Sequence, residues 1–230
     1  MAEVVLALDL PNGEEAMRLL DRLPEARWVK VGSILMTREG APFIRELIGR
    51  GLRVFLDLKW HDIPNTVAGS VTAARELGVS MATVHALGGR MMMEAAAVAA
   101  GGELALVGVT VLTSHDGASY GRATGRAQVS VPEEVVRQAQ EAASAGLAGI
   151  VCSAAEVAVA RRALPDGAIL VVPGIRREDE VVGDQVRVAT ARDAAQSGAT
   201  HLVVGRPVIR ATDPAEALRR LREEAGCVVS

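Results

Sequence analysis

Short runs of Val, Ile and Leu alternate along the chain with longer segments in which hydrophobic residues recur every three or four positions. Short apolar runs are typical of strands buried on both faces of a parallel sheet, and the longer period is typical of helices that pack one face against it. The pattern predicts strands at Val4–Asp9, Trp28–Val31, Val54–Lys59, Met81–His85, Leu104–Val111, Gly149–Cys152, Ile169–Pro173 and His201–Val204. It predicts helices at residues 13–23, 38–50, 63–77, 90–100, 132–145, 154–163, 190–197 and 214–225.

These eight strand–helix units favour a closed (β/α)8 barrel, the TIM barrel of the α/β class. An open doubly wound sheet usually has fewer strands and a glycine-rich first turn, and the turn from Asp9 to Gly13 lacks that glycine pattern. A length of 230 residues with 50% hydrophobic content suits one large core. We therefore expect a single barrel domain over residues 1–230.

Two predicted connections at the carboxyl ends of strands are longer than the others, Leu112–Val131 and Gly174–Val188. Both are polar and contain glycine, and long loops in a compact domain are usually functional. The carboxyl ends of the strands form the face where barrel enzymes have their active sites. We interpret both loops as lids over that face, with plain surface insertions as the alternative.

The charge distribution argues against several classes of partner. The net charge of −3 comes from interspersed acids and bases, so no basic surface for nucleic acid is expected. The first ten residues carry Glu3 and Asp9 and no basic residue, which does not fit a signal peptide. No apolar stretch approaches the ~18 residues of a membrane span. We expect a cytoplasmic protein whose two cysteines, Cys152 and Cys227, are reduced and inert.

Ionisable residues gather at the ends of four consecutive predicted strands, where an idle charge would be costly. These residues are Asp9, Lys30, Asp57, Lys59 and His85. Asp57 and Lys59 are two positions apart, so both side chains should point to the same face of the strand, into the barrel mouth. Lys30 on the neighbouring strand should complete an array of alternating carboxylates and ammonium groups. The array is either a reaction centre or a structural ion-pair network.

Lysine is rare in this chain, because only Lys30 and Lys59 among the 25 basic residues are lysines. Arginine can replace lysine at most surface positions, but a guanidinium practically cannot give up a proton, whereas an ammonium group can. Both lysines belong to the array at the barrel mouth. Their position favours a reaction in which an ammonium group donates a proton.

Arginine and glycine follow the last two predicted strands, in Pro173–Arg176 and Gly205–Pro207. Many barrels bind a substrate phosphate at the ends of these two strands. Gly205 would let backbone amides approach the anion, and Arg206 could bind it through two hydrogen bonds. We therefore expect the substrate to carry a phosphate monoester.

Asp62 and Thr66 follow the third strand at a spacing of four, which places two residues on one helix face. Asp62 precedes Pro64 and is either an active-site residue or the N-cap of the helix. The four histidines show no metal-ligand spacing, so we predict no metal and treat His85 as a structural or wall residue. We also find no motif for an organic cofactor and predict none.

Taken together, these motifs resemble those of the bacterial orotidine 5′-monophosphate decarboxylases. The run from Asp57 to Thr66, DLKWHDIPNT, resembles the signature of that family. Further matches occur in the family's order: LALD at Asp9, WVKVG at Lys30, VLTS at Thr113, PGIR at Arg176, DQ at Gln185 and VVGRPVI at Arg206. They span most of the chain. Trp60 departs from the Phe of many relatives, which leaves the charged array intact.

The resemblance implies a carboxy-lyase that converts orotidine 5′-monophosphate to uridine 5′-monophosphate, the last step of de novo pyrimidine nucleotide biosynthesis, without a cofactor. It implies that Lys59 donates a proton to C6 of the pyrimidine once the carboxylate has left. Asp9 and Lys30 would contact the ribose hydroxyls, and Lys30 would also brace Asp57.

The resemblance also implies a homodimer, because Asp62 and Thr66 would enter the active site of the other subunit. Thr113 and its loop would close over the pyrimidine. The base edge and the phosphate would be held by Arg176, Gln185, Gly205 and Arg206.

Two other functions fit parts of the sequence. A magnesium-dependent sugar-phosphate decarboxylase on the same barrel would share the Asp-x-Lys-x-x-Asp pattern, but the HDIPNT run and the segment around Gln185 argue against it. A silent nucleotide-binding barrel would not need both lysines together with Asp57 and Asp62. A purely structural oligomer would leave the phosphate loops unexplained.

Overall fold

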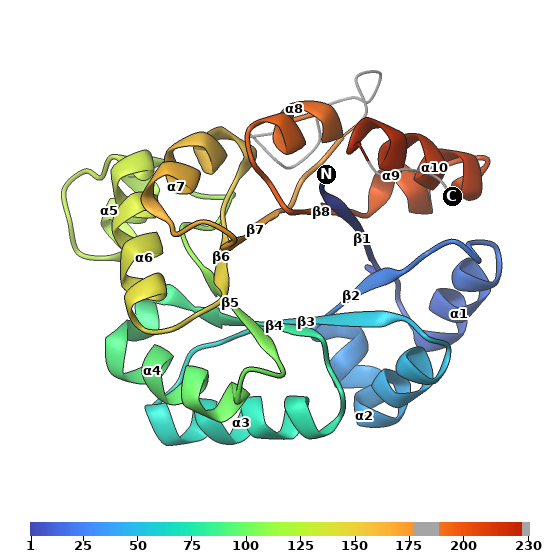
Figure 1. Ribbon diagram of the computed structural model, residues 1–230, viewed down its shortest axis with the longest axis horizontal. Helices are drawn as coiled ribbons and strands as arrows, with labels where there is room; N and C mark the ends of the chain where they lie inside the picture. Colours follow the sequence, from blue (N-terminus) through green and yellow to red (C-terminus); the bar gives the residue numbers. More distant parts are fainter. Residues whose placement is uncertain (177–188, 227–230) are drawn as a thin grey trace.

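The strands form a closed parallel barrel in a computed structural model that describes residues 1–176 and 189–226. Their order around the barrel is their order in the sequence. The strands are β1 (Glu3–Ala7), β2 (Trp28–Gly32), β3 (Arg53–Trp60), β4 (Met81–His85), β5 (Ala105–Val109), β6 (Gly149–Val151), β7 (Ile169–Val172) and β8 (His201–Val204). Figure 1 shows them as a central ring with the helices outside. The predicted (β/α)8 fold is confirmed.

The helices cover the outside of the barrel. The longer ones are α1 (Gly13–Asp21), α2 (Ser33–Gly49), α3 (Pro64–Glu76), α4 (Gly89–Ala100), α6 (Val131–Ser144) and α10 (Pro214–Glu224). The short ones are α5 (Gly117–Ala123), α7 (Val157–Ala163), α8 (Ala191–Gln196), α9 (Arg206–Ile209) and the 3-10 helices η1 (Ala86–Gly88) and η2 (Ala154–Glu156). Within the described ranges, no helix is long and apolar enough to cross a membrane.

Hydrophobic side chains fill both sides of the sheet. Alternate strand residues form one cluster inside the barrel: Val5, Ala7, Trp28, Phe55, Met81, Val107, Val171 and Val203. The residues between them, such as Val4 and Leu6, belong to a larger cluster between the strands and the helices. Asp9 and Asp57 follow inward-facing residues by two positions, so the alternation that builds the core also aims these carboxylates into the barrel mouth.

The second helix begins earlier than the pattern predicted, at Ser33 instead of residue 38. Gly40 interrupts it with φ 65° and ψ −159°, two residues before Pro42, so the segment consists of two helices joined at a kink. In the part before Gly40 only Leu35 is buried. Its hydrophobic period is therefore too weak to indicate a helix.

The predicted loop Leu112–Val131 is partly helical, so the expectation of a connection without a helix is wrong, while its role as a lid stays a prediction. It contains α5, and Asp116 begins this helix with a capping box. The Asp116 carboxylate accepts the amide hydrogen of Ser119 at 2.7 Å, and the Ser119 hydroxyl accepts that of Asp116 at 3.0 Å. A helix of this length is too short to show a hydrophobic period.

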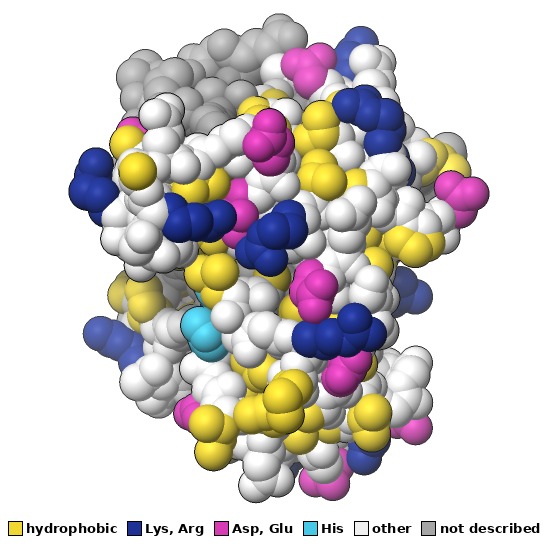
Figure 2. Space-filling model, turned by 90° about the vertical axis from the view of Figure 1, so that its left-hand side faces the viewer, with side chains coloured by type: hydrophobic (Ala, Val, Ile, Leu, Met, Phe, Trp, Pro, Cys, Tyr) yellow, Lys and Arg dark blue, Asp and Glu magenta, His cyan; other side chains and the backbone are white. Residues whose placement is uncertain are grey.

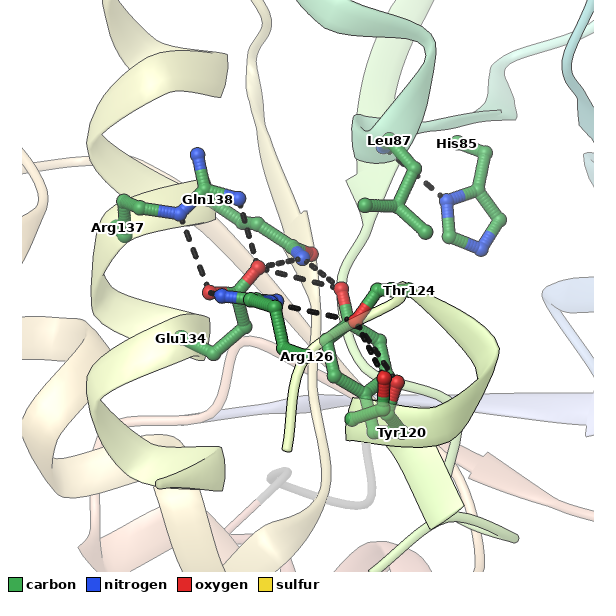
Figure 3. Close-up of polar contacts among 9 residues, drawn as sticks. His85, Leu87, Tyr120, Thr124, Arg126, Glu134, Arg137 and Gln138 are labelled. Carbon is green, nitrogen blue, oxygen red and sulfur yellow. Dashed lines mark hydrogen bonds and ion pairs between the residues drawn. The ribbon is translucent and has the colours of Figure 1, made fainter. Parts of the chain in front are cut away.

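A buried polar network joins α5 to α6 (Figure 3). The Tyr120 hydroxyl donates to Glu134 at 3.2 Å and accepts from the Gln138 amide at 2.6 Å. Glu134 also binds Arg126 at 3.0 Å and Arg137 at 2.7 Å. Burial alone would raise the pKa of Glu134, but the hydrogen bonds from the arginines and Gln138 outweigh it and lower the pKa to about 2. The segment after β5 is thus fixed at its far end.

Candidate active site

A cavity of about 570 Å³ lies at the carboxyl ends of the strands. Its walls come from every strand except β4 and from the segments that follow those strands. The charged lining residues are Asp9, Lys30, Asp57, Lys59, Arg176, Arg206 and Arg210, and the apolar ones include Ala7, Phe55, Val109, Val151, Val171 and Val203. A pocket of this size with an apolar floor and converging charges suits a small anionic ligand.

Four of the predicted charges form a continuous chain of ion pairs in this cavity. The Lys30 ammonium lies 3.1 Å from Asp9 and 3.6 Å from Asp57, and the Lys59 ammonium lies 2.8 Å from Asp57. The side chains of Lys30 and Asp57 are 11% and 14% exposed, whereas that of Lys59 is 40% exposed. Asp57 therefore contacts both ammonium groups, and Lys59 remains accessible to a ligand.

The backbone at Lys59 leaves the strand conformation. Its φ is 53°, and no other non-glycine residue in the described part of the chain has a positive φ. β3 pairs with β4 at Leu56↔Ala82 and again at Trp60↔Val84, so the residues from Asp57 to Lys59 lie opposite Thr83 alone. The alternation of strand residues correctly placed Asp57 and Lys59 together, but it could not predict this bulge.

Three arginines line the side of the cavity formed after β7 and β8: Arg176, Arg206 and Arg210. The Arg176 amide donates to the Ala189 carbonyl at 3.1 Å, which fixes the start of the segment after β7. Gly205 directly precedes α9, and Arg206 is the first residue of this helix. Both segments that were predicted to bind phosphate therefore contribute to one cavity.

Asp62 and Thr66 lie outside the cavity of their own chain. Both are exposed, at the start of α3. The N-cap of α3 is Ile63, and Asp62 only accepts the amide hydrogen of Ile63 at 2.6 Å, so the N-cap alternative for Asp62 is wrong. Because Asp62 precedes the helix, the spacing of four does not place it on a helix face with Thr66.

Thr113 lines the cavity on the segment between β5 and α5. The amide of His115 donates to the Leu112 carbonyl at 2.9 Å, so Thr113 lies inside a tight turn. Gln185 lies outside the described residues, as does most of the predicted second lid.

Two titratable side chains, one near Lys59 and one in the cavity wall, are held uncharged. His85 stacks on His61 with ring centroids 5.5 Å apart, and its Nδ1 accepts the amide hydrogen of Leu87 at 3.3 Å (Figure 3). Burial, together with His61 and Lys59, lowers the pKa of His85 to about 4. Burial raises the pKa of the Cys152 thiol in the cavity wall to about 12. Cys152 therefore stays protonated and is a poor nucleophile.

Sequence reasoning did not identify two residues of this site, Thr83 and Arg210. Thr83 is fully buried on β4 and contacts both Asp57 and Lys59. A polar residue in an apolar strand, two positions before His85, was the available signal. Arg210 follows Arg206 by four residues, one helical turn, which was the signal for a second cation.

No group of three or more His, Cys, Asp or Glu side chains in residues 1–176 and 189–226 is placed to hold a metal ion.

Known proteins resemble this chain over nearly its whole length. The model of the orotidine 5′-phosphate decarboxylase / HUMPS family matches residues 2–221. Orotidine 5′-phosphate decarboxylase of Coxiella burnetii is 45% identical over 228 residues, covering 96% of each chain. The enzyme of the same name from Alkalilimnicola ehrlichii is 48% identical over 227 residues, covering 97% of this chain and 96% of that one.

Solved structures agree with this result. The crystal structure of orotidine 5′-phosphate decarboxylase from Lactobacillus acidophilus superposes with a TM-score of 0.87 at 35% identity, covering 98% of this chain and 99% of that one. The enzyme from Pyrococcus horikoshii gives a TM-score of 0.78 at 26% identity, covering 98% of this chain and 100% of that one. The resemblance predicted from the sequence is confirmed. The chain belongs to the orotidine 5′-phosphate decarboxylase / HUMPS family.

Proposed function

We propose that the protein decarboxylates orotidine 5′-monophosphate to uridine 5′-monophosphate, the last step of de novo pyrimidine nucleotide synthesis. The single observation that carries this proposal is the ammonium group of Lys59, which lies 2.8 Å from Asp57 and faces the cavity, in a chain of this family. We infer that residues 1–230 act as one cytoplasmic catalytic domain, with no nucleic-acid or membrane partner.

Lys59 is the proposed proton donor. When the bond between C6 and the carboxylate breaks, carbon dioxide leaves and the electron pair stays on C6. A fixed ammonium group stabilises this charge without reorganisation and then transfers its proton to C6, after which lysine recovers a proton from water. The reaction as proposed needs neither a metal nor an organic cofactor.

Asp57 has a double role in this proposal. It fixes the positions of Lys59 and Lys30, with oxygen–nitrogen distances of 2.8 and 3.6 Å. It also places a carboxylate close to the expected position of the substrate carboxylate, and the repulsion between them is relieved when carbon dioxide leaves. Asp9 and Lys30 are 3.1 Å apart and are proposed to bind the ribose hydroxyls.

Binding of the phosphate is proposed to offset that repulsion. Arg176, Arg206 and Arg210 line the cavity after β7 and β8, and the array runs from Asp9 after β1, which pairs with β8, to Lys59 on β3. Guanidinium groups bind phosphate through paired, charge-assisted hydrogen bonds. The proposed binding set further includes Gly205, Thr113 over the pyrimidine, and Gln185. Contacts far from C6 can thus support the chemical step.

We further propose a homodimer in which Asp62 and Thr66 enter the partner's active site. Both are exposed and lie outside their own cavity, although they directly follow the strand that carries Lys59. Large hydrophobic side chains on neighbouring segments are also exposed: Ile34, Ile63, Leu87 and Met91. Hydrophobic side chains gather near α3 and α4 in the lower part of Figure 2. Exposed apolar surface of this kind supports the proposed interface.

The test is the loss of orotidine 5′-monophosphate absorbance in the presence of EDTA, for the wild type and for Lys59→Ala. We expect rapid, metal-independent conversion by the wild type and almost none by the variant, with both proteins folded by circular dichroism. No conversion by folded wild type would overturn the proposal. Conversion only after magnesium is added would point to a sugar-phosphate decarboxylase type of chemistry instead.

A further inference from the structure

The Thr83 hydroxyl joins the backbone of Lys59 to the Asp57 carboxylate, which in turn binds the Lys59 ammonium. Its hydroxyl oxygen lies 2.7 Å from the backbone nitrogen of Lys59 and 3.1 Å from the Asp57 carboxylate. The ammonium of Lys59 binds the same carboxylate oxygen at 2.8 Å. These contacts form a closed ring: the Lys59 amide, the Thr83 hydroxyl, the Asp57 carboxylate and the Lys59 ammonium.

The chemistry of the groups fixes the direction of each hydrogen bond in the ring. A backbone amide can only donate and an ionised carboxylate can only accept, so the hydroxyl must accept from Lys59 and donate to Asp57. A hydroxyl has one hydrogen, and this arrangement uses it. Valine has the same shape but can do neither, whereas serine can do both.

The ring lies where the backbone is least favourable. Lys59 has a φ of 53°, a conformation that is unfavourable for a residue with a side chain. The bulge removes Lys59 from the ladder between β3 and β4, so its amide has no strand carbonyl of β4 opposite it. The hydroxyl of Thr83 occupies that place. Thr83 is completely buried and does not line the cavity, so it acts only through its neighbours.

We propose that Thr83 is a positioning residue for the decarboxylation: it holds Lys59 in the left-handed conformation that directs the ammonium toward the substrate, and it orients Asp57. This inference rests on the proposed function of Lys59. Without the hydroxyl, Lys59 relaxes toward an ordinary strand conformation and its ammonium moves away from C6. Substrate affinity, to which the arginines after β7 and β8 are proposed to contribute, is affected much less.

The experiment compares Thr83→Val with Thr83→Ser, and uses Thr110→Val as the matched control. Thr110 is also completely buried, on the segment after β5, but its hydroxyl donates to the Val151 carbonyl at 2.8 Å and takes no part in the ring. We would measure kcat and KM for orotidine 5′-monophosphate, the Kd for uridine 5′-monophosphate, and the melting temperature of each variant.

We expect Thr83→Val to lower kcat about 10- to 100-fold, because a small misplacement of a reacting group has effects of that size. The Kd for the product should stay within about twofold, and Thr83→Ser should recover most of kcat. Thr110→Val should at most lower the melting temperature and should leave kcat unchanged. If Thr83→Val does not fold, Thr83→Ala, which removes the hydroxyl without adding bulk, is measured against the same serine variant.

Wild-type kcat in a folded variant that lacks the hydroxyl would overturn the inference. So would an equal loss in Thr110→Val, a loss confined to product binding, or failure of serine to restore the rate. Failure of the proposed function appears differently, as activity retained by Lys59→Ala. A low kcat in Thr83→Val and in Lys59→Ala, with a kcat near that of the wild type in Thr83→Ser, supports both the positioning role of Thr83 and the proposed function.

Discussion

Arg206 is the residue for which the structure gives the clearest substrate-dependent prediction. It begins α9 after Gly205 and lines the cavity together with Arg210, four residues further on. If Arg206 binds the phosphate, Arg206→Ala should lower kcat/KM for orotidine 5′-monophosphate about 100-fold, because charge-assisted hydrogen bonds are lost. The control is orotidine without phosphate, for which the same variant should match the wild type. An equal loss on both substrates would assign Arg206 a role unrelated to phosphate.

The residues around Lys59 also show how far single positions could be predicted. The parallel barrel brings strand ends together, and the two-residue period places Asp57 and Lys59 on one face, so the charged array followed from pattern alone. The φ of Lys59 and the role of Thr83 depend on a bulge between β3 and β4. A bulge has no signal in the hydrophobic pattern of either strand, so that pattern presents Thr83 as one more strand residue.

The network between α5 and α6 predicts an acid-dependent stability at the scale of these two elements. Its buried carboxylate, Glu134, has a pKa lowered from 4.5 to about 2 by hydrogen bonds that outweigh burial. A lowered pKa means that the folded state binds the proton less tightly than the unfolded state. The network therefore stabilises the fold fully above pH 4.5, and this contribution is lost as the pH falls toward about 2.

Glu134→Gln should lower the melting temperature at pH 7 by about 5 °C, since it removes the carboxylate that binds Arg126 and Arg137. The difference from the wild type should narrow between pH 4.5 and about 2. Glu216→Gln is the matched control, because Glu216 also binds two arginines, Arg219 and Arg220, but on the exposed side of α10. Its melting temperature should change little. If the melting-temperature difference between Glu134→Gln and the wild type did not change with pH, the shape of the Glu134 side chain, not its charge, would account for the stabilisation.

At the scale of elements, the hydrophobic pattern predicted most helices, including the short α7 and α8, but it missed α5, α9 and the first part of α2. α5 depends on a capping box at Asp116 and on the contacts of Tyr120, and its seven residues are too few for a period. The kink at Gly40 depends on a backbone conformation that only glycine adopts easily. Local hydrogen bonds and backbone conformation decide both features, and the hydrophobic pattern carries no signal for either.

At the scale of the whole molecule, the proposed dimer predicts that two inactive variants can restore each other's activity, which a monomeric enzyme cannot show. Asp62 is exposed and lies outside the cavity of its own chain, whereas Lys59 lines that cavity. If each active site takes Lys59 from one subunit and Asp62 from the other, Lys59→Ala and Asp62→Ala should each abolish nearly all activity as homodimers. A mixed dimer of the two variants then has one site with both residues intact and one site with neither.

Mixing the two inactive variants, after dissociation and reassociation, should therefore restore activity. Random pairing makes half of the dimers mixed and leaves one of the two sites intact in each, so about a quarter of the wild-type activity should return. The measurement is the rate of orotidine 5′-monophosphate loss against the mixing ratio, with a maximum at equal amounts. The control mixes Lys59→Ala with Asp57→Ala, whose residues lie in one cavity, so that no pairing restores an intact site. No recovery in the first mixture, with exchange of subunits verified by mass, would show that Asp62 does not enter the neighbouring site. The dimer would then have no role in completing the active site.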